Sequence, residues 1–204
     1  MADAAPLVFV VDDDDSIRTA LERLIRSVGF RVRSFRTARD FLAQARCDAP
    51  CCLILDVRMP QMSGLELQEK MAGKNLPMPI VFITGHGTVA MGVQAMKAGA
   101  VDFLEKPFEE QLLLDTIQSA IEKDRRTRQE NALVSSLRQR ADQLTPRERE
   151  VFKQVVSGLL NKQIAAVLNI SEKTIKVHRA RVMAKMKADS LAALVRMADK
   201  IDLT

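Results

Sequence analysis

Four positions in the first part of the chain carry side chains that could together handle a phosphoryl group. They are the acidic stretch 12–15, Asp56, Thr84 and Lys106, and each follows a short apolar run, Lys106 after one intervening residue. An aspartate can act as a nucleophile toward phosphorus, while a hydroxyl and an ammonium can contact the transferred oxygens. Taken alone, Asp56 could equally be a cap or turn residue after a core strand. The set predicts phosphoryl-transfer chemistry if the fold brings the four positions together.

The apolar runs before these residues indicate strands of a parallel sheet. Five β-rich runs alternate with helical patterns over about 120 residues, which predicts a doubly wound α/β fold. The run 51–55 is apolar throughout, as expected of a central strand covered by helices on both faces. Five strands favour the flavodoxin-like order 2-1-3-4-5. The expected strands are 7–11, 31–35, 51–55, 79–83 and 101–104, and the expected helices are 16–28, 37–46, 64–73, 88–98 and one from 109 onward, with Ser16, Thr37 and Thr88 as caps.

This strand order places the acidic stretch 12–15 beside Asp56. Crowded carboxylates repel one another unless a cation is present, and an all-oxygen set with room for water suits Mg²⁺. Geometry decides only weakly which two of the four acidic residues bind the ion, and it favours Asp12 and Asp13, nearest the strand end. A solvated acidic loop is the alternative for the stretch.

Charge is divided unevenly along the 204 residues. The part up to Asp124 has 14 Lys and Arg against 18 Asp and Glu, whereas the remainder has 17 against 8. The two parts therefore carry −4 and +9. This asymmetry indicates an acidic module joined to one that meets a polyanion, most commonly nucleic acid. A merely solvated basic face is the alternative.

The cysteines and the hydropathy pattern bear on the compartment. Cys47, Cys51 and Cys52 are too few and too close together for a disulfide framework or a zinc site, and they resemble small core residues of a reduced protein. We expect no signal peptide and no transmembrane helix, because no run of about 18 apolar residues occurs. A cytoplasmic protein with no membrane partner is the expectation.

A helical spacer is expected between the two parts. Residues 108–144 contain no Pro or Gly, and residues 122–131 are entirely polar. Leu133, Leu137, Ala141 and Leu144 then recur at helical spacing, either as a dimer seam or as a face docked on the second domain. The expected domains are residues 1–123, a linker at 124–143, and residues 144–204.

The second domain shows the pattern of a helix-turn-helix protein. Thr145, followed by Pro-Arg-Glu, is typical of a capped helix start, and that helix should end at Gly158. A second helix begins at Asn161, and Ser171 caps a basic third helix.

One face of the third helix is suited to DNA. Lysines around a small apolar residue fit a major groove, where Lys meets guanine or phosphate and Val meets a thymine methyl. Arginines and further lysines could add phosphate contacts. A solvated lysine face is the alternative, and His178 is expected to pack at the helix edge. The candidate DNA contacts are Lys173, Thr174, Lys176, Val177, Arg179, Arg181 and Lys185.

Residues 7 to about 123 resemble the receiver domain of two-component response regulators. The resemblance is carried by Asp12-Asp13, Asp56 with Met59-Pro60 and Gly64, Thr84-Gly85, and Lys106-Pro107. It implies that Asp56 is the phosphoacceptor for a phosphohistidine on a sensor histidine kinase. It also implies Mg²⁺ held by Asp12, Asp13, Asp56 and the Arg58 backbone carbonyl, phosphoryl contacts from Thr84 and Lys106, and a cis Lys106-Pro107 bond. Phe103 stands where the family often has a switch tyrosine, although a core phenylalanine is equally expected, and His86 is expected to be structural.

Residues 144 to about 201 resemble the four-helix LuxR-type DNA-binding domain. The matching stretches are 144–148, Gly158, 161–165 and 171–178. The sequences of 84–87, 103–108 and 182–186 are similar to those of the FixJ-like branch. The resemblance implies a phosphorylation-switched transcription factor, expected to be an activator, that binds double-stranded promoter DNA as a homodimer. The family often dimerises through the fourth helix, fifth strand and fifth helix, and RNA polymerase is a further candidate partner. Ala180 replaces a base-contacting lysine of some relatives, which leaves the bases read open.

Two other classes of protein compete with this interpretation. A phosphatase of the haloacid dehalogenase type would have Asp-x-Asp at its nucleophile, but Val57-Arg58 follows Asp56 and no cap domain is present. We therefore expect no enzyme. A regulator with a degenerate receiver is disfavoured because Asp12, Asp13 and Lys106 are all present.

Overall fold

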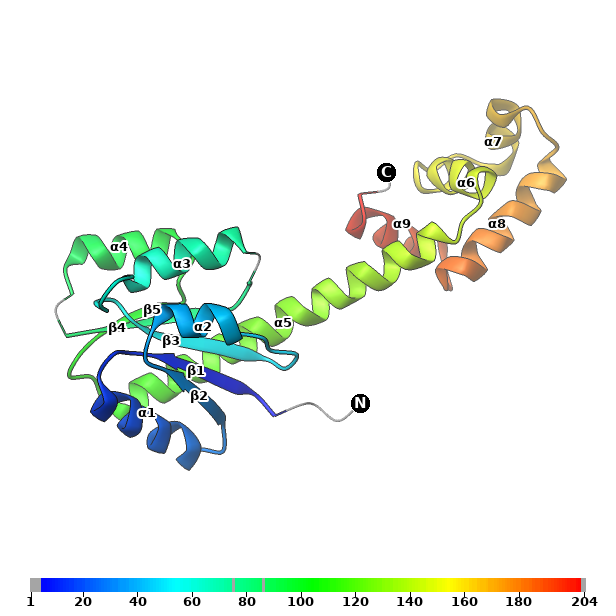
Figure 1. Ribbon diagram of the computed structural model, residues 1–204. Coiled ribbons are helices and arrows are strands. Elements are labelled where there is room, and N and C mark those ends of the chain that lie inside the picture. Colours follow the sequence, from blue (N-terminus) through cyan, green and yellow to red (C-terminus); the bar gives the residue numbers. More distant parts are fainter. Residues whose placement is uncertain (1–4, 75, 86, 203–204) are drawn as a thin grey trace. The chain divides into compact units, whose positions relative to one another are not determined.

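A computed structural model describes residues 5–74, 76–85 and 87–202 (Figure 1). The chain forms two compact units, Met1–Arg128 and Gln129–Thr204. The boundary falls inside one helix, α5 (Glu110–Asp142). The expected linker 124–143 is therefore divided: Asp124 and Arg128 contact the first unit, while Leu137 and Ala141 are buried in the core of the second.

The first unit is a five-stranded sheet in the order β2-β1-β3-β4-β5, with every pairing parallel. This confirms the flavodoxin-like fold. The strands are β1 (Leu7–Val11), β2 (Arg31–Phe35), β3 (Cys51–Asp56), β4 (Ile80–Thr84) and β5 (Asp102–Glu105), and the helices are α1 (Asp15–Ser27), α2 (Ala38–Gln44), α3 (Gly64–Gly73), α4 (Val89–Lys97) and the start of α5.

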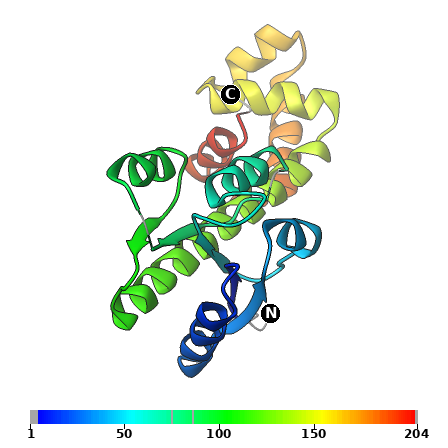
Figure 2. The same ribbon diagram turned by 60° about the vertical axis from the view of Figure 1, so that its left-hand side comes forward.

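The apolar strands are buried because helices cover both faces of the sheet (Figures 1 and 2). Side chains alternate along a strand, so each strand contributes to two cores. Phe9, Leu53 and Phe82 pack with α2, α3 and α4. Val8 and Ile54 pack with α1 and α5 on the other face. Residues 7–11 and 51–56 are buried throughout, as the uniformly apolar pattern predicted.

Side-chain caps fix where the helices begin. Thr37 and Thr88 cap α2 and α4 as predicted, because their hydroxyls accept from backbone N–H groups of the first turn. The expectation for Ser16 is wrong. Asp14 caps α1 instead, and its carboxylate accepts from the backbone N–H groups of Ser16 and Ile17.

The second unit is a helical bundle. Its helices are the end of α5, α6 (Pro146–Val156), α7 (Asn161–Leu168), α8 (Glu172–Met186) and α9 (Leu191–Lys200). Thr145 and Glu148 form the predicted capping box at the start of α6. Asn169, in the left-handed conformation at φ 51°, ends α7 and leads into the turn before α8. The order of short helix, tight turn and basic helix confirms a helix-turn-helix.

The repeat of apolar residues near the end of α5 has a structural explanation. Leu137, Ala141 and Leu144 are buried in the core of the second unit, with Phe152, Val182 and other apolar side chains of α6 and α8. Leu133 is 44% exposed. The sequence allowed either a dimer seam or a face docked on the second domain. These three positions form the docked face.

Within the described residues, no helix is both long and apolar enough to cross a membrane.

Candidate phosphoacceptor site and DNA-binding surface

The parallel register brings the candidate residues of the first unit to one edge of the sheet. Val11 is paired with Leu55, so Asp12 follows β1 beside the point where Asp56 ends β3. Thr84 ends β4 and is paired with Glu105, directly before Lys106. Four positions from four strands therefore meet at the carboxyl edge, where open α/β sheets bind ligands.

Lys106 joins two of these strands through its side chain. Its Nζ donates to Asp12 Oδ2 at 2.8 Å and to Asp56 Oδ1 at 2.9 Å. Burial of the ammonium disfavours its charged form, but the two hydrogen-bonded carboxylates outweigh this effect and raise the pKa of Lys106. The Lys106 backbone N–H also donates to the Thr84 carbonyl at 2.7 Å, and the Lys106-Pro107 peptide is cis, as the resemblance implied.

Asp56 is 6% exposed, and both its oxygens accept hydrogen bonds. Oδ1 accepts from Lys106, and Oδ2 accepts from the backbone N–H of Arg58 at 2.7 Å. Burial raises the pKa of Asp56, and the ammonium of Lys106 counters the effect only in part, while the charge of Asp12 adds to it. The carboxylate is thus held in one orientation at the strand end, beside a single cation.

The acidic stretch divides into residues with different roles. Asp14 caps α1, and Asp15 forms an ion pair with Arg18. These two carboxylates are therefore engaged in the first turn of the helix. Asp12 is buried against Lys106, and its Oδ1 accepts from the Asp14 backbone at 2.9 Å, while Asp13 is half-buried. Asp12 and Asp13 remain as the candidates for cation binding within the stretch.

Arg18 also holds the backbone of Asp12, a role that was not predicted from the sequence. Its Nη1 donates to the backbone carbonyl of Asp12 at 2.7 Å, and its side chain is only 13% exposed. The i,i+3 spacing of Asp15 and Arg18 is the signal that could have identified this anchor.

The side chains of Thr84 and Phe103 both lie close to Gly87. A methyl group built on Gly87 would come within 2.9 Å of both Thr84 Cγ2 and the Phe103 ring. Thr84 is buried, Phe103 is half-buried, and the Phe103 ring centroid is 6.3 Å from that of Phe82. The loop after β4 therefore packs against both candidate switch residues. The expectation for His86 lies outside the described residues.

No three His, Cys, Asp or Glu side chains are grouped as ready metal ligands in residues 5–74, 76–85 and 87–202. The Lys106 ammonium supplies the positive charge between Asp12 and Asp56 in this structure. Mg²⁺ needs only one or two carboxylates, because it retains several water molecules. Asp12 and Asp56, which lie close enough to share the Lys106 ammonium, therefore fit such an ion.

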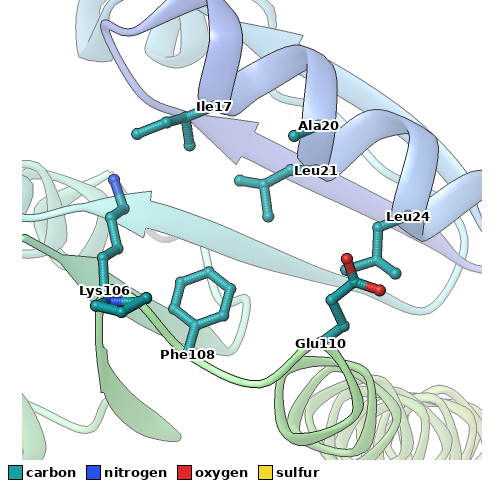
Figure 3. A pocket seen from close by; sticks show the side chains of 8 residues that line it. Ile17, Ala20, Leu21, Leu24, Lys106, Phe108 and Glu110 are labelled. Atoms are coloured by element: carbon teal, nitrogen blue, oxygen red, sulfur yellow. The ribbon is translucent and has the colours of Figure 1, made fainter.

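A pocket of about 320 Å³ adjoins Lys106 on the side of α1 (Figure 3). Ile17, Leu21 and Leu24 of α1 form one wall, and Phe108, after β5, lies across from them. Figure 3 shows these apolar side chains directed into the space between the two segments. The lining is thus mostly apolar, with the charged groups of Lys106 and Glu110 at its margin.

In the second unit, the first half of α8 presents the expected DNA-contacting face. Lys173, Lys176 and Val177 are exposed, and Val177 is 46% accessible although it is apolar. Ile175 and Val182 are buried on the opposite side. Lys176 Nζ lies 3.4 Å from Glu172 Oε1 one turn earlier. The exposed positions on α8 are Glu172, Lys173, Thr174, Lys176, Val177, Ala180, Arg181 and Ala184.

Three other candidates for DNA contact are engaged within the unit. Lys185 Nζ donates to Glu148 Oε2 at 2.6 Å, so its ammonium neutralises a buried carboxylate. Arg179 donates to Asn161 Oδ1 at 3.1 Å, and the Thr174 hydroxyl lies 2.7 Å from that of Ser171 in the helix cap. Lys185 thus differs most from the expectation, and the contact with Glu148 gives it a scaffold role. His178 is half-buried.

Comparison with known proteins assigns both units. Residues 8–118 match the family described as "Response regulator receiver domain", and residues 142–198 match "Bacterial regulatory proteins, luxR family". Nodulation protein W of Bradyrhizobium diazoefficiens is 48% identical over 203 residues, covering 100% of this chain and 89% of that protein. Transcriptional regulatory protein FixJ of Rhizobium meliloti is 46% identical over 191 residues, covering 94% of each chain.

A solved structure supports the same assignment. The response regulator StyR, determined at low resolution, superposes with a TM-score of 0.87 at 49% identity, covering 97% of this chain and 100% of that one. The chain therefore belongs to the two-component response regulators, as a FixJ-like, phosphorylation-controlled transcription regulator with a receiver domain and a LuxR-type DNA-binding domain.

Proposed function

We propose that Asp56 accepts the phosphoryl group in this regulator and that its modification promotes dimerisation and promoter binding. The observation that carries the proposal is the placement of Lys106 Nζ, within 2.9 Å of both Asp12 and Asp56 at the carboxyl edge of the sheet. A buried nucleophile held beside a cation suits phosphoryl transfer, because catalysis there depends on positioning and charge stabilisation.

The transfer would proceed by attack of an Asp56 oxygen on phosphorus. The bond between phosphorus and the imidazole nitrogen of the sensor kinase breaks, an acyl phosphate forms, and the imidazole leaves as the neutral base. Lys106 then pairs with a phosphoryl oxygen, and the Thr84 hydroxyl donates to another. The Arg58 N–H, which now donates to Asp56 Oδ2 at 2.7 Å, fixes the rotation of the carboxylate.

Receiver domains generally bind Mg²⁺ at the phosphorylation site, and the residues here fit that ion. We assign it to Asp12, Asp13, Asp56 and the backbone carbonyl of Arg58. The ion would neutralise the charge that accumulates when a phosphoryl group joins the carboxylates. Arg18 holds the backbone of Asp12 in place for this task through its 2.7 Å hydrogen bond.

The signal would leave the site through Thr84 and Phe103. Because Gly87 packs against both, movement of Thr84 toward a phosphoryl group changes the space available to the Phe103 ring. The neighbouring α4 exposes three large apolar residues, Val89 at 86%, Val93 at 46% and Met96 at 47%. This surface, with β5 and α5, is the proposed homodimer interface.

The partners follow from the two surfaces already described. The apolar pocket beside Lys106 (Figure 3) is the proposed docking face for the helix of the sensor kinase that carries the phosphohistidine. The exposed face of α8 is proposed to enter the major groove of promoter DNA. We further propose that the protein acts in the cytoplasm as an activator, with RNA polymerase as a partner.

Under this proposal the chain is not an enzyme. Asp56 keeps its phosphoryl group as a signal, and Val57-Arg58 follows it where an aspartate-nucleophile phosphatase has a second carboxylate two residues on. The Glu148–Lys185 pair, in which the carboxylate is buried at the start of α6, belongs to the second unit and stabilises its fold.

The experiment compares the wild type with Asp56→Asn, each treated with a small-molecule phosphodonor and magnesium. We expect a shift from monomer to dimer in sedimentation, and tighter binding to selected promoter DNA, in the wild type alone. Equal responses of both proteins, or none in either, would contradict the proposed switch.

A further inference from the structure

One segment of the receiver has a charge opposite to that of the unit as a whole. Residues 16–46 contain eight Arg, no Lys and only two acidic residues, whereas the other residues up to Asp124 contain six Lys and Arg against 16 Asp and Glu. The arginines lie on α1, β2 and α2 and in the segments that follow β2 and α2. A strongly basic region is therefore part of an otherwise acidic unit.

The centre of this basic region is β2, the strand at one edge of the sheet (Figure 1). Arg31 and Arg33 are exposed on β2, and Arg36 is exposed directly after it. Side chains alternate along a strand, so Arg31 and Arg33 lie on the same side of the sheet as Phe35, which packs in the core with α2 and α3. At about 3.3 Å per residue, Arg31, Arg33 and Arg36 form an arginine row about 17 Å long.

The charges of the arginine row are not neutralised within the unit. Among the residues that the structure describes, no carboxylate forms an ion pair with any member of the row. The two acidic residues of the basic region are engaged elsewhere. Glu22 pairs with Arg26 at 2.9 Å, one turn apart on α1. Asp40 accepts from the Thr37 hydroxyl at 2.7 Å in the first turn of α2. The row therefore presents an uncompensated positive charge to solvent.

Neutral groups position the central arginine of the row. Arg33 Cζ lies 5.5 Å from the centroid of the Phe35 ring, and Arg33 Nη2 lies 3.5 Å from Gln44 Oε1 of α2. These contacts restrict the guanidinium without cancelling its charge. A side chain that is already restricted loses less conformational entropy when it binds an anion than a freely rotating side chain loses.

A row of arginines along an extended strand fits the phosphates of a nucleic acid. Guanidinium groups bind phosphate oxygens through paired N–H donors. Each strand of B-form DNA carries one phosphate per about 3.4 Å of helix axis, which is close to the rise per residue of a β-strand. A row about 17 Å long therefore spans about five phosphates of one DNA strand.

Two observations favour DNA over an acidic protein surface as the occupant. The second unit belongs to a DNA-binding family, so α5 joins the receiver to a unit that binds a polyanion. The pocket proposed to dock the sensor kinase is lined by α1 and Phe108, whereas Arg31 and Arg33 lie on the side of the sheet that packs with α2 and α3. The kinase and the arginine row thus use different surfaces.

We propose that the arginine row is a second DNA-contacting surface, which binds the sugar–phosphate backbone outside the bases that α8 contacts. Contacts to phosphates carry no sequence information, so the row adds affinity and salt dependence without changing which bases are read. The row also offsets the repulsion between DNA and the net negative charge of the receiver. This role does not depend on phosphorylation of Asp56.

The test measures the affinity of the full chain for a long DNA duplex by fluorescence anisotropy at several salt concentrations. A duplex of unrelated sequence suffices, because backbone contacts do not depend on the bases. Arg31→Gln combined with Arg33→Gln should reduce the slope of log affinity against log salt by about two. Arg31→Lys combined with Arg33→Lys keeps both charges and should retain most of the wild-type slope.

The matched control is Lys70→Gln combined with Lys74→Gln, which removes two exposed lysines at the end of α3 and changes the net charge equally. The control should keep the wild-type slope. An equal fall in slope for both glutamine variants would show that net charge acts rather than the row, and would overturn the proposal. A wild-type slope in the arginine-to-glutamine variant would also overturn it. If that variant then accepts phosphoryl groups more slowly from its sensor kinase, the row belongs to an acidic protein surface instead.

Discussion

A single ammonium shared by two carboxylates determines the chemistry of the receiver site. Lys106 is the cation that faces both Asp12 and Asp56, and all three side chains are largely buried. Without it, two neighbouring carboxylates in a poorly solvated site would share no counter-charge, and at least one of them would bind a proton more tightly. The charge state of the nucleophile therefore depends on Lys106.

This dependence predicts the titration of a Lys106→Met variant. The pKa of Asp56, already raised by burial, should rise further when the ammonium is removed, because the hydrogen bond and charge of Lys106 now oppose the effect of burial. Side-chain carboxyl NMR, recorded as a function of pH, measures the shift. Lys97→Met, which removes an exposed lysine at the end of α4, is the matched control and should leave the Asp56 titration unchanged. An unaltered Asp56 pKa in Lys106→Met would show that the ion pair does not determine the charge state of the Asp56 carboxyl.

The buried Glu148 gives a second prediction, on stability and pH. The hydrogen bond from Lys185, and then the one from the Thr145 backbone, lower the pKa of Glu148 below its ordinary value of 4.5. A lowered carboxyl pKa stabilises the fold above the unfolded value, and this contribution is lost as pH falls through the folded value. Glu148→Gln should lower the free energy of unfolding by about 2 kcal/mol at neutral pH.

Urea denaturation at neutral pH and at a pH well below 4.5 measures this effect. The difference between wild type and Glu148→Gln should shrink in acid, because the wild-type carboxyl is then protonated. Glu150→Gln is the control, since Glu150 is exposed and pairs with Arg147 on the surface of the same helix. If Glu148→Gln lowers the free energy of unfolding equally at both pH values, the charge of Glu148 contributes nothing to stability.

Residue-level roles could be predicted from the sequence only where a strand fixed the position. Asp56, Thr84 and Lys106 follow apolar runs, so parallel pairing alone brought them to one edge. The helix cap at Asp14 could not be separated from its acidic neighbours, because any of them can accept from a helix N-terminus. Likewise the partner of Lys185 depends on how α6 packs against α8, which no local pattern encodes.

At the level of elements, the site requires that α3 begin directly against the end of β3. The Gly64 backbone N–H donates to the Val57 carbonyl at 2.9 Å. A methyl group at Gly64 would lie 2.4 Å from the Asp56 carbonyl oxygen and 3.0 Å from the ring of Phe82. Glycine at this position thus permits the short connection that orients the residues after Asp56.

Gly64→Ala is therefore expected to destabilise the receiver by about 2 kcal/mol, because the new methyl would overlap the Asp56 backbone carbonyl oxygen, which cannot move aside as a flexible side-chain end can. Gly73→Ala, at the other end of the same helix, is the matched control, since nothing lies within 4 Å of its added carbon. Urea denaturation of the two variants and the wild type measures the change in the free energy of unfolding. Equal stability of Gly64→Ala and wild type would show that the connection relaxes without cost.

The hydrophobic pattern of the sequence predicted the boundaries of the strands but not how far α5 contacts the receiver. The strands were predicted to within one or two residues, because each is a short apolar run between polar segments. The helix α5 was expected to leave the receiver near residue 124, where its apolar pattern ends. Instead Asp124 and Arg128 remain attached to the first unit through polar contacts with Cys47 and Cys51, which a hydrophobic pattern does not report.

At the scale of the whole molecule, the two units differ both in the sign of their net charge and in their function. The acidic part contains the carboxylate site, and the basic part presents lysines on the exposed face of α8. Binding to DNA through such residues releases counterions, so affinity should fall steeply as salt rises. Val177, an exposed apolar residue next to Lys176, would add an apolar contact to DNA that salt does not weaken.

Lys176→Ala should therefore reduce the slope of log affinity against log salt by about one, if its ammonium contacts a phosphate. Lys153→Ala, which removes an exposed lysine from α6, is the control and should change neither slope nor affinity. Fluorescence anisotropy on promoter DNA at several salt concentrations measures both. A slope unchanged by Lys176→Ala would assign the phosphate contacts to another face.

The central claim, that Asp56 is the residue modified, is tested most directly by locating the phosphoryl group. The full chain is treated with a small-molecule phosphodonor and magnesium, the acyl phosphate is reduced with borohydride, and tryptic peptides are sequenced by mass spectrometry. The account predicts one reduced aspartate, Asp56, in the peptide between Arg46 and Arg58. Reduction at Asp12, Asp13 or Asp48 with Asp56 intact, or no reduced aspartate at all, would contradict it.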